Sequence, residues 1–113
     1  MNEPSEHPSC IDACIACARA CEECGDACLT EPDAAYRVRC IRLNRDCAIV
    51  CWTAAELMSR ESPLVEEMCG VCVGICTACA GECERFPELH CQRCTEACRR
   101  CAEECRQMSG MVV

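Results

Sequence analysis

The sequence is poor in the large apolar residues from which a soluble domain usually builds its core. Ile, Leu, Val and Phe supply only 18 of the 113 residues, a share below the roughly 20% typical of folded domains. The aromatic residues are limited to Tyr36, Trp52 and Phe86. Cysteine fills the gap, because the chain holds 19 cysteines beside 14 alanines and a free cysteine behaves as a small buried hydrophobe. We therefore expect cysteine side chains to form part of the core.

Lysine is absent: all 11 basic residues are arginines, they face 19 acidic residues, and the formal net charge is −8. We do not expect so acidic a chain to bind nucleic acid or an anionic membrane surface, since both carry negative charge. A long apolar run is also missing, because no segment approaches the about 20 apolar residues that a membrane-spanning helix needs. The expected partners therefore include no nucleic acid and no membrane.

The first eight residues are polar and carry no recognisable export signal. They lack a positively charged start, an apolar stretch and a twin-arginine motif. We therefore expect a cytoplasmic protein, in which thiols are kept reduced. Cysteines in that compartment point to metal or redox chemistry rather than to a disulfide framework.

The spacing of the cysteines is the most informative pattern in the chain. In three of four groups the steps alternate between three and four residues, which places all cysteines of a group on one stripe of an α-helix. The second group steps by seven and four, and Leu43 or Asn44, Ala54 or Ala55, and Met58 fill its missing stripe positions. The groups are Cys10, Cys14, Cys17, Cys21, Cys24 and Cys28; Cys40, Cys47 and Cys51; Cys69, Cys72, Cys76, Cys79 and Cys83; and Cys91, Cys94, Cys98, Cys101 and Cys105.

Segments that contain Pro32, Pro63 and Pro87 separate the groups and are expected to end the helices. Ser62 is a candidate N-cap, with Pro63 in the first helical position. Short connections favour antiparallel neighbours. The chain is thus predicted to be one all-α domain over residues 1–113, an up-down-up-down antiparallel four-helix bundle with a cysteine-lined core. The expected helices cover residues 8–29, 34–59, 63–84 and 88–108.

The third expected helix is apolar almost all round between Val71 and Gly81, and the second becomes so near Ile49 and Trp52. A helix that is apolar on every side needs a second partner. This pattern suggests self-association through the second and third helices, and ordinary packing within one monomer is the alternative.

A bundle of four cysteine stripes can bind soft metal ions. Residues three or four apart on a helix have Cβ atoms about 5–6 Å apart, so each stripe offers repeated pairs of thiolates. Thiolates select Cu(I), Zn(II) or iron–sulfur clusters. Cluster sites usually use irregular loops, often with a proline after a cysteine, and that sequence does not occur here.

Charge favours Cu(I) over Zn(II). A zinc ion bound by four thiolates leaves a net charge of −2. Burying the charge of about four or five such sites without counterions would cost more free energy than the about 5–15 kcal/mol of stability of a domain. One Cu(I) per thiolate gives a neutral column, and no arginine is expected on the stripes to balance excess negative charge. The cargo is therefore predicted to be Cu(I), with multiple ions per monomer. A zinc or general soft-metal buffer, a thiol redox protein and a plain structural bundle remain alternatives.

The two ends of the bundle are expected to differ. His7, Met58 and Met108 continue the stripes at one end, with Met68 and Met111 nearby. Imidazole and thioether groups bind Cu(I) more weakly than thiolates do, so these residues suggest a mouth where copper enters. The alternative is that the methionines simply fill the end of the bundle. No catalytic residue set accompanies these ligands, so we do not expect an enzyme.

The opposite end is expected to be closed by loops that carry Leu29, Phe86 and Leu89. His90 is expected to start the fourth helix rather than to bind metal. Asn44 is expected to be a polar residue that specifies the bundle, as such residues do at core positions of coiled coils.

The cysteine stripes resemble those of the four-helix-bundle copper storage proteins of bacteria. The likeness runs from Cys10 to Met108 and rests on the patterns CxxxCxxCxxxCxxCxxxC, CxxCxxxCxxC and CxxCxxxCxxC on separate helices. The sequence resembles the cytosolic branch of the family, because the exported branch carries a twin-arginine signal and this sequence has none. The resemblance implies a homotetramer, many Cu(I) ions per monomer, and a role in storage, buffering or detoxification. A copper chaperone or a copper-requiring protein is a further expected partner, and the three cysteines of the second helix depart from the full pattern.

Overall fold

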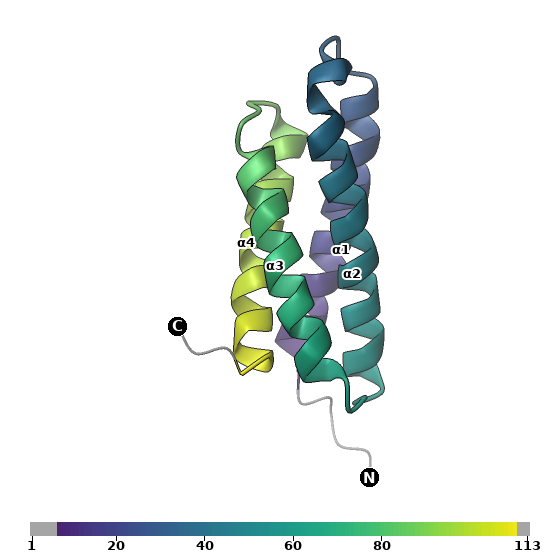
Figure 1. Cartoon of the computed structure of the whole chain (residues 1–113), viewed down its shortest axis with the longest axis vertical. Helices are drawn as coiled ribbons and strands as arrows, with labels where there is room; N and C mark the ends of the chain where they lie inside the picture. Colours follow the sequence, from purple (N-terminus) through teal and green to yellow (C-terminus); the bar gives the residue numbers. More distant parts are fainter. Residues whose placement is uncertain (1–6, 111–113) are drawn as a thin grey trace.

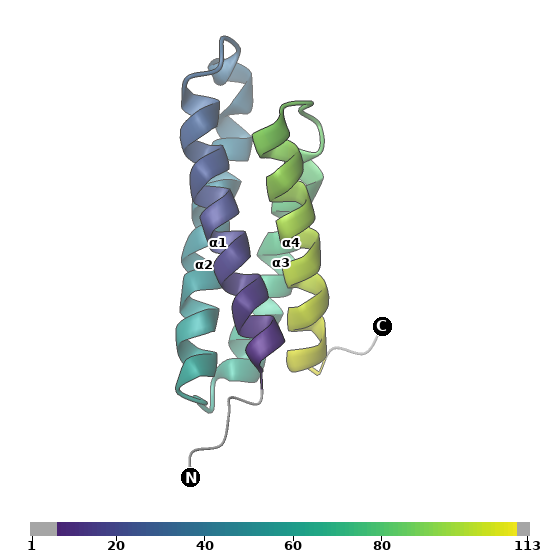
Figure 2. The same cartoon turned by 180° about the vertical axis from the view of Figure 1, so that it is seen from behind.

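The computed structural model describes residues 7–110, which form four long α-helices running alternately up and down (Figure 1). Each helix packs against two neighbours: α1 and α3 each contact both α2 and α4. Figure 2 shows α1 and α4 side by side on the other face of the bundle. The predicted all-α, antiparallel four-helix bundle is confirmed. The elements are α1 (Pro8–Leu29), the 3₁₀ turn η1 (Ala34–Arg37), α2 (Val38–Ser59), α3 (Val65–Cys83) and α4 (Leu89–Met108).

The second and third helices begin later than the sequence suggested. Residues 34–37 form a 3₁₀ turn, so α2 starts at Val38 rather than at 34. Ser62 does not cap α3 directly; its hydroxyl accepts a hydrogen bond from the backbone N–H of Leu64 at 3.1 Å, and Pro63 lies within this turn. The helix α3 follows at Val65.

The C-terminal end of α2 is closed by backbone bonds in the pattern of a Schellman motif. The N–H of Glu61 donates to the carbonyl of Met58 at 3.1 Å, and that of Ser62 donates to the carbonyl of Leu57 at 2.9 Å. Glu61 has φ 53°, the left-handed conformation this motif requires and that glycine usually supplies. This tight ending turns the chain back so that α3 can run antiparallel to α2.

Cysteine forms the greater part of the core. All 19 cysteine side chains are buried, and small residues such as Ala13, Ala18 and Ala48 fill the space between the helices. Small side chains let the four helices approach closely, which brings the sulfur atoms together along the bundle axis. Met58 and Phe86 are among the few large side chains in this core.

The loop end of the bundle is closed differently from our expectation. Phe86 is buried, but Leu29 and Leu89 are 52% and 59% exposed and cap nothing. Leu29 follows Cys28 by one residue, so its side chain lies about 100° away from the cysteine stripe around the helix.

Among residues 7–110, none of the helices combines the length and the apolar character needed to cross a membrane.

Candidate metal centre

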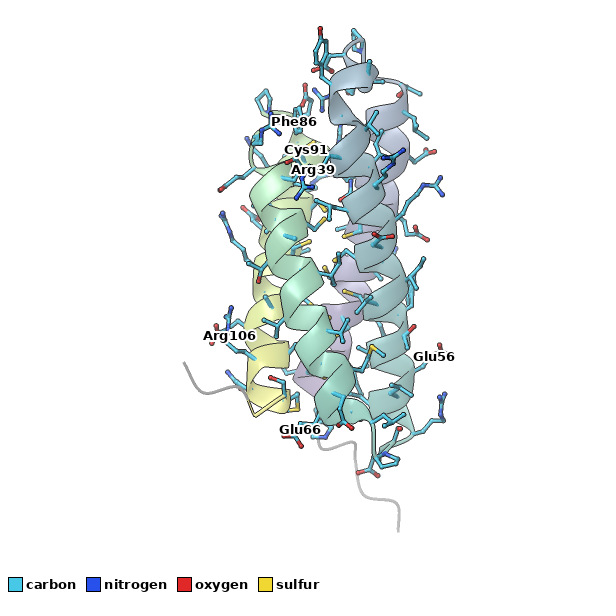
Figure 3. All side chains as sticks on the ribbon, in the orientation of Figure 1. Arg39, Glu56, Glu66, Phe86, Cys91 and Arg106 are labelled. Atoms are coloured by element: carbon cyan, nitrogen blue, oxygen red, sulfur yellow. The ribbon has the colours of Figure 1, made fainter. Side chains whose placement is uncertain are left out.

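The four stripes meet along the bundle axis and form a column of thiols. Sulfur atoms lie inside the bundle along much of its length (Figure 3). Each helix contributes one cysteine at mid-height, where Cys17 Sγ lies 3.8 Å from Cys47, 3.9 Å from Cys76 and 3.5 Å from Cys98. The thiols are all free and buried. In the metal-free state they satisfy one another as weak S–H donors and sulfur acceptors.

These thiols form overlapping groups of four rather than separate sites. Within each group the sulfur atoms lie within 4.8 Å of one another. Cys17, Cys21, Cys98 and Cys101 each belong to at least two groups, so neighbouring groups share ligands. Such sharing suits a chain of metal ions bridged by thiolates better than isolated tetrahedral sites, each of which needs four ligands of its own. Four of these groups are Cys14, Cys72, Cys101 and Cys105; Cys17, Cys51, Cys76 and Cys101; Cys17, Cys21, Cys47 and Cys98; and Cys21, Cys79, Cys94 and Cys98.

Asn44 occupies one of the stripe positions where α2 lacks a cysteine, and its side chain is fully buried. Its Oδ1 accepts hydrogen bonds from the thiols of Cys79 at 3.0 Å, Cys94 at 3.2 Å and Cys83 at 3.4 Å. Its Nδ2 lies 3.7 Å from the sulfur of Cys40. The amide therefore connects α2 with α3 and α4, in keeping with the expected bundle-specifying role, and also presents an oxygen to the column.

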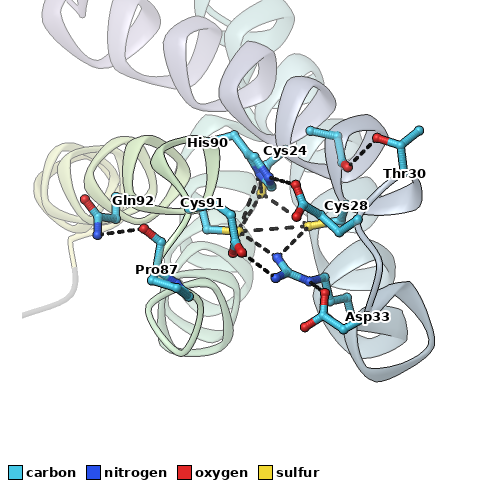
Figure 4. A network of polar contacts seen from close by, with 12 residues as sticks. Cys24, Cys28, Thr30, Asp33, Pro87, His90, Cys91 and Gln92 are labelled. Carbon is cyan, nitrogen blue, oxygen red and sulfur yellow. Dashed lines mark hydrogen bonds and ion pairs between the residues drawn. The ribbon is translucent and has the colours of Figure 1, made fainter.

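His90 also takes part in the column, which the sequence analysis missed. It stands at the start of α4, as expected, but its Nδ1 lies 3.4 Å from the sulfur of Cys24 and 3.5 Å from that of Cys91. Together with Cys28 these atoms form a mixed sulfur and nitrogen group that could hold a metal ion. The Nε2 lies 3.4 Å from Glu31 Oε1, which orients the ring (Figure 4). One signal was available: His90 directly precedes a stripe cysteine at the rim.

Arg37 corrects the expectation that no arginine lies on a stripe. It lies within the second expected helix, three residues before Cys40, and thus continues the α2 stripe. Its side chain is only 2% exposed. The Nη1 atom donates toward the sulfur atoms of Cys28, at 3.9 Å, and Cys91, at 3.7 Å. The column therefore ends, on the loop side, at a buried positive charge.

Carboxylates and an aromatic ring hold this guanidinium in place. Arg37 Nε donates to Asp33 Oδ1 at 2.6 Å, Nη2 pairs with Glu88 Oε2 at 2.8 Å, and Cζ lies 4.4 Å from the centre of the Phe86 ring. The hydrogen bonds from Arg37 lower the pKa of both carboxyl groups below their usual range. A buried arginine is stable only with such partners.

Burial favours the protonated form of the thiols beside Arg37. Burial raises the pKa of Cys28 and of Cys91, and the nearby Cys24 raises both further, while the hydrogen bond from Arg37 acts in the opposite direction on Cys28. Neighbouring thiols cannot all ionise together without a cation, because like charges a few ångströms apart repel. A metal ion must therefore displace protons as it binds.

The expected mouth residues lie where the sequence placed them along the helices. Met58 is fully buried in the cysteine core, and Met108 and Met68 are half-buried against it. His7 is half-buried at the N-cap position of α1. These residues stand at the end of the bundle where α1 and α3 begin and α2 and α4 end, whereas Met111 lies outside the described residues.

This thiol column coincides with a family pattern that spans nearly the whole chain. The family model described as Csp, copper storage protein, matches residues 3–110. The chain belongs to the copper storage protein family. That family is defined by storage rather than by catalysis, and the match includes every cysteine of the column.

Known proteins with the same architecture carry copper. The chain is similar to the Cu(I)-bound copper storage protein BsCsp3, with a TM-score of 0.85, 45% identity, and coverage of 88% of this chain and 94% of that one. It is also similar to a cytosolic copper storage protein from Streptomyces lividans, solved with five coppers, with a TM-score of 0.87, 38% identity, and coverage of 93% and 92%. A curated relative, the uncharacterised cysteine-rich protein YhjQ of Bacillus subtilis, is 45% identical over 86% of this chain and 88% of its own.

The carboxylates beside Arg37 make the stability of the loop end depend on pH. Because the folded state lowers the pKa of Asp33 and of Glu88, their contribution is present at neutral pH and is lost as the pH falls below about 4.5 through the lowered values. We expect acidification from about pH 6 to about pH 3 to lower the free energy of unfolding of the reduced, metal-free protein. The loss should be smaller in Arg37→Met, whose carboxylates have lost their cation.

Urea unfolding followed by circular dichroism measures this difference. The matched control is Arg39→Met, which changes an exposed arginine two residues away and should keep the acid sensitivity of the unchanged protein. Equal acid sensitivity in Arg37→Met and in the unchanged protein would contradict the assignment of this pH dependence to the Arg37 network.

Proposed function

We propose that this chain is a cytosolic copper storage protein that binds many Cu(I) ions per monomer on its 19 core cysteines and catalyses no reaction. The observation that carries the proposal is the sharing of cysteines between neighbouring four-thiol groups. A continuous set of shared ligands can hold a variable number of ions, which is what a store requires. The metal-binding residues proposed are all 19 cysteines, with Met58, Met108 and His7 at the mouth.

The charge of the column supports Cu(I) over Zn(II). Arg37 is the one cation in contact with the column among the described residues, and two carboxylates already partner it. One added positive charge cannot balance the excess negative charge of several four-thiolate zinc sites in so narrow a core. Each Cu(I) neutralises one thiolate, so a fully loaded column is close to neutral without further cations.

The spacing of the sulfur atoms also suits Cu(I). Pairs one helical turn apart, such as Cys47 with Cys51 at 3.8 Å and Cys72 with Cys76 at 3.7 Å, lie slightly closer than the about 4.5 Å span of a linear S–Cu–S unit. Rotation about χ1 of one cysteine can supply the difference, because the staggered rotamers are close in energy. The helices can therefore stay in place as ions enter.

Anaerobic titration with Cu(I) against a competing chelator tests the function. We expect saturation well above five ions per chain and approaching one ion per cysteine, with the helical circular dichroism unchanged, because the ligands are already assembled. Zn(II) added to the same protein is the control and should saturate at about four or five ions or fewer. Cu(I) saturation at four or five ions, or weak binding, would contradict the storage proposal. Reversible disulfide formation with loss of helicity would favour the redox alternative.

The proposed location is the cytosol. The Streptomyces lividans relative is described as cytosolic, and a reducing compartment would keep the 19 thiols free and able to bind metal. The proposed copper donor or recipient is a copper chaperone or a copper-requiring protein, because buried ions must be exchanged through direct ligand transfer.

Copper is proposed to enter and leave at the end that holds His7, Met58 and Met108. A thioether binds Cu(I) without a charge and more weakly than a thiolate, so it can pass an ion to Cys10 or Cys105 nearby. Met58 is the innermost of these side chains, and Met108 lies closer to the solvent.

Replacement of both Met58 and Met108 by leucine removes the thioethers with little change in volume. We expect Cu(I) to load and leave more slowly by about tenfold, while the final capacity falls only slightly. Stopped-flow loading and removal by a chelator measure the rates. Met68→Leu is the matched control, because Met68 lies at the same end but does not continue a cysteine stripe. Unchanged rates in the double variant would refute the mouth.

We further propose that the chain self-associates through α2 and α3, as a homotetramer of bundles. Ile49 is 64% exposed, Trp52 37% and Val71 53%, and they lie on these two adjacent helices. Exposed apolar side chains grouped in this way are typical of an interface between proteins. The number of four copies is what the resemblance of the cysteine stripes to the copper storage proteins implies.

Sedimentation equilibrium tests this assembly. The unchanged protein should sediment as a tetramer, and Trp52→Arg should shift it to smaller species because a charge would be buried in the interface. Tyr36→Arg changes an aromatic residue that is 82% exposed at the loop end, and it should leave the assembly intact. A monomeric unchanged protein would contradict the proposal.

A further inference from the structure

The loop end of the column contains a charged side chain that storage itself does not require. Arg37 is nearly inaccessible to solvent, although it comes from a short 3₁₀ turn at the surface of the bundle. Its Nη1 faces the sulfur atoms of Cys28 and Cys91, the outermost thiols of α1 and α4. These contacts place the guanidinium beside the last sulfur atoms of the column, and Figure 4 shows the polar contacts around Cys28 and Cys91.

We propose that Arg37 is a plug that closes the loop end of the thiol column, so that Cu(I) exchanges through the opposite end. The inference deepens the proposed function and rests on it wherever copper is concerned. The closure itself is a property of the metal-free protein and can be tested there.

Groups from both loops at this end hold the plug. Asp33 lies in the segment between α1 and η1, whereas Phe86 and Glu88 lie between α3 and α4. The guanidinium bonds to both carboxylates and stacks against the ring, so it connects the two loops across the loop end of the column. Charge-assisted bonds of this kind are about twice as strong as neutral ones. An arginine with partners on every side stays in place more firmly than an apolar plug held by packing alone.

The plug opposes Cu(I) in two ways. The guanidinium occupies the space over Cys28 and Cys91 through which an ion from the loop side would have to pass. Its positive charge also repels an approaching cation, and this repulsion is stronger in a buried site than in water. Beside it, His90 places its Nδ1 3.4 Å from the sulfur of Cys24 and its Nε2 3.4 Å from Glu31 Oε1, so a second polar side chain stands at this end of the column.

Thiol modification in the reduced, metal-free, full-length protein tests the plug. N-ethylmaleimide reacts with accessible thiols, and peptide mass spectrometry assigns the rate at each cysteine. In Arg37→Ala we expect Cys28 and Cys91 to react about ten- to a hundredfold faster than in the unchanged protein, because opening no longer breaks the charge-assisted bonds. The rates at Cys10 and Cys69, at the other end of the column, should stay the same.

Arg39→Ala is the matched control, since it removes an exposed arginine from the next turn and should change no rate. Unchanged rates at Cys28 and Cys91 in Arg37→Ala would overturn the proposal. If all 19 thiols react faster in that variant, the bundle has loosened, and Glu88→Gln then decides the question. This second variant keeps Arg37 and weakens one tie across the loops, so it should raise the rates at Cys28 and Cys91 selectively, by a smaller factor. No selective rise in Glu88→Gln would contradict the plug.

A copper measurement separates this proposal from the storage proposal. With Cu(I) loaded, Arg37→Ala should release copper to a chelator faster by about tenfold and keep the same capacity. A low Cu(I) capacity of the unchanged protein would contradict the storage proposal, and the thiol-labelling result would still test the plug. If the unchanged protein stores Cu(I) as proposed but Arg37→Ala leaves the thiol-labelling rates and the copper-release rate unchanged, only the plug proposal is contradicted.

Discussion

The close approach of buried sulfur atoms from four helices is the interaction on which the rest of the structure depends. Cys17, Cys47, Cys76 and Cys98 meet at mid-height, and similar contacts recur above and below them. Thiols this close cannot all lose their protons unless cations replace them. The same side chains therefore serve as a neutral apolar core without metal and as a ligand column with it, and charge neutrality restricts which metal can fill the column.

Periodicity in the sequence was sufficient to predict the bundle and its core. Alternating steps of three and four residues place cysteines on one side of a helix whatever surrounds them, and no tertiary information is needed. The family resemblance and the choice of Cu(I) followed from the same stripes. The thiol contacts between helices, such as Cys40 with Cys83 at 3.4 Å, then follow from packing four such stripes together.

The ends of the column were harder to predict because loop geometry decides them. Arg37 continues a stripe by number, but its contacts with Cys28 on α1 and Cys91 on α4 cannot be read from the spacing within one segment. His90 reaches Cys24 on another helix, a contact that spacing within one segment cannot reveal. Leu29 and Leu89 were assigned to the closure on hydrophobicity alone, yet the direction of the terminal helical turns leaves them in solvent. Charged and polar side chains, rather than leucines, close this end.

The number of protons released per Cu(I) at saturation tests the central claim most directly. A pH-stat titration of the reduced protein, with copper bound measured on the same sample, gives this ratio. A neutral column filled through protonated thiols should release about one proton per Cu(I) once it is full. A ratio of about two or more at saturation would mean that the core holds an excess of thiolate charge. That result would contradict the account of a store limited by charge neutrality.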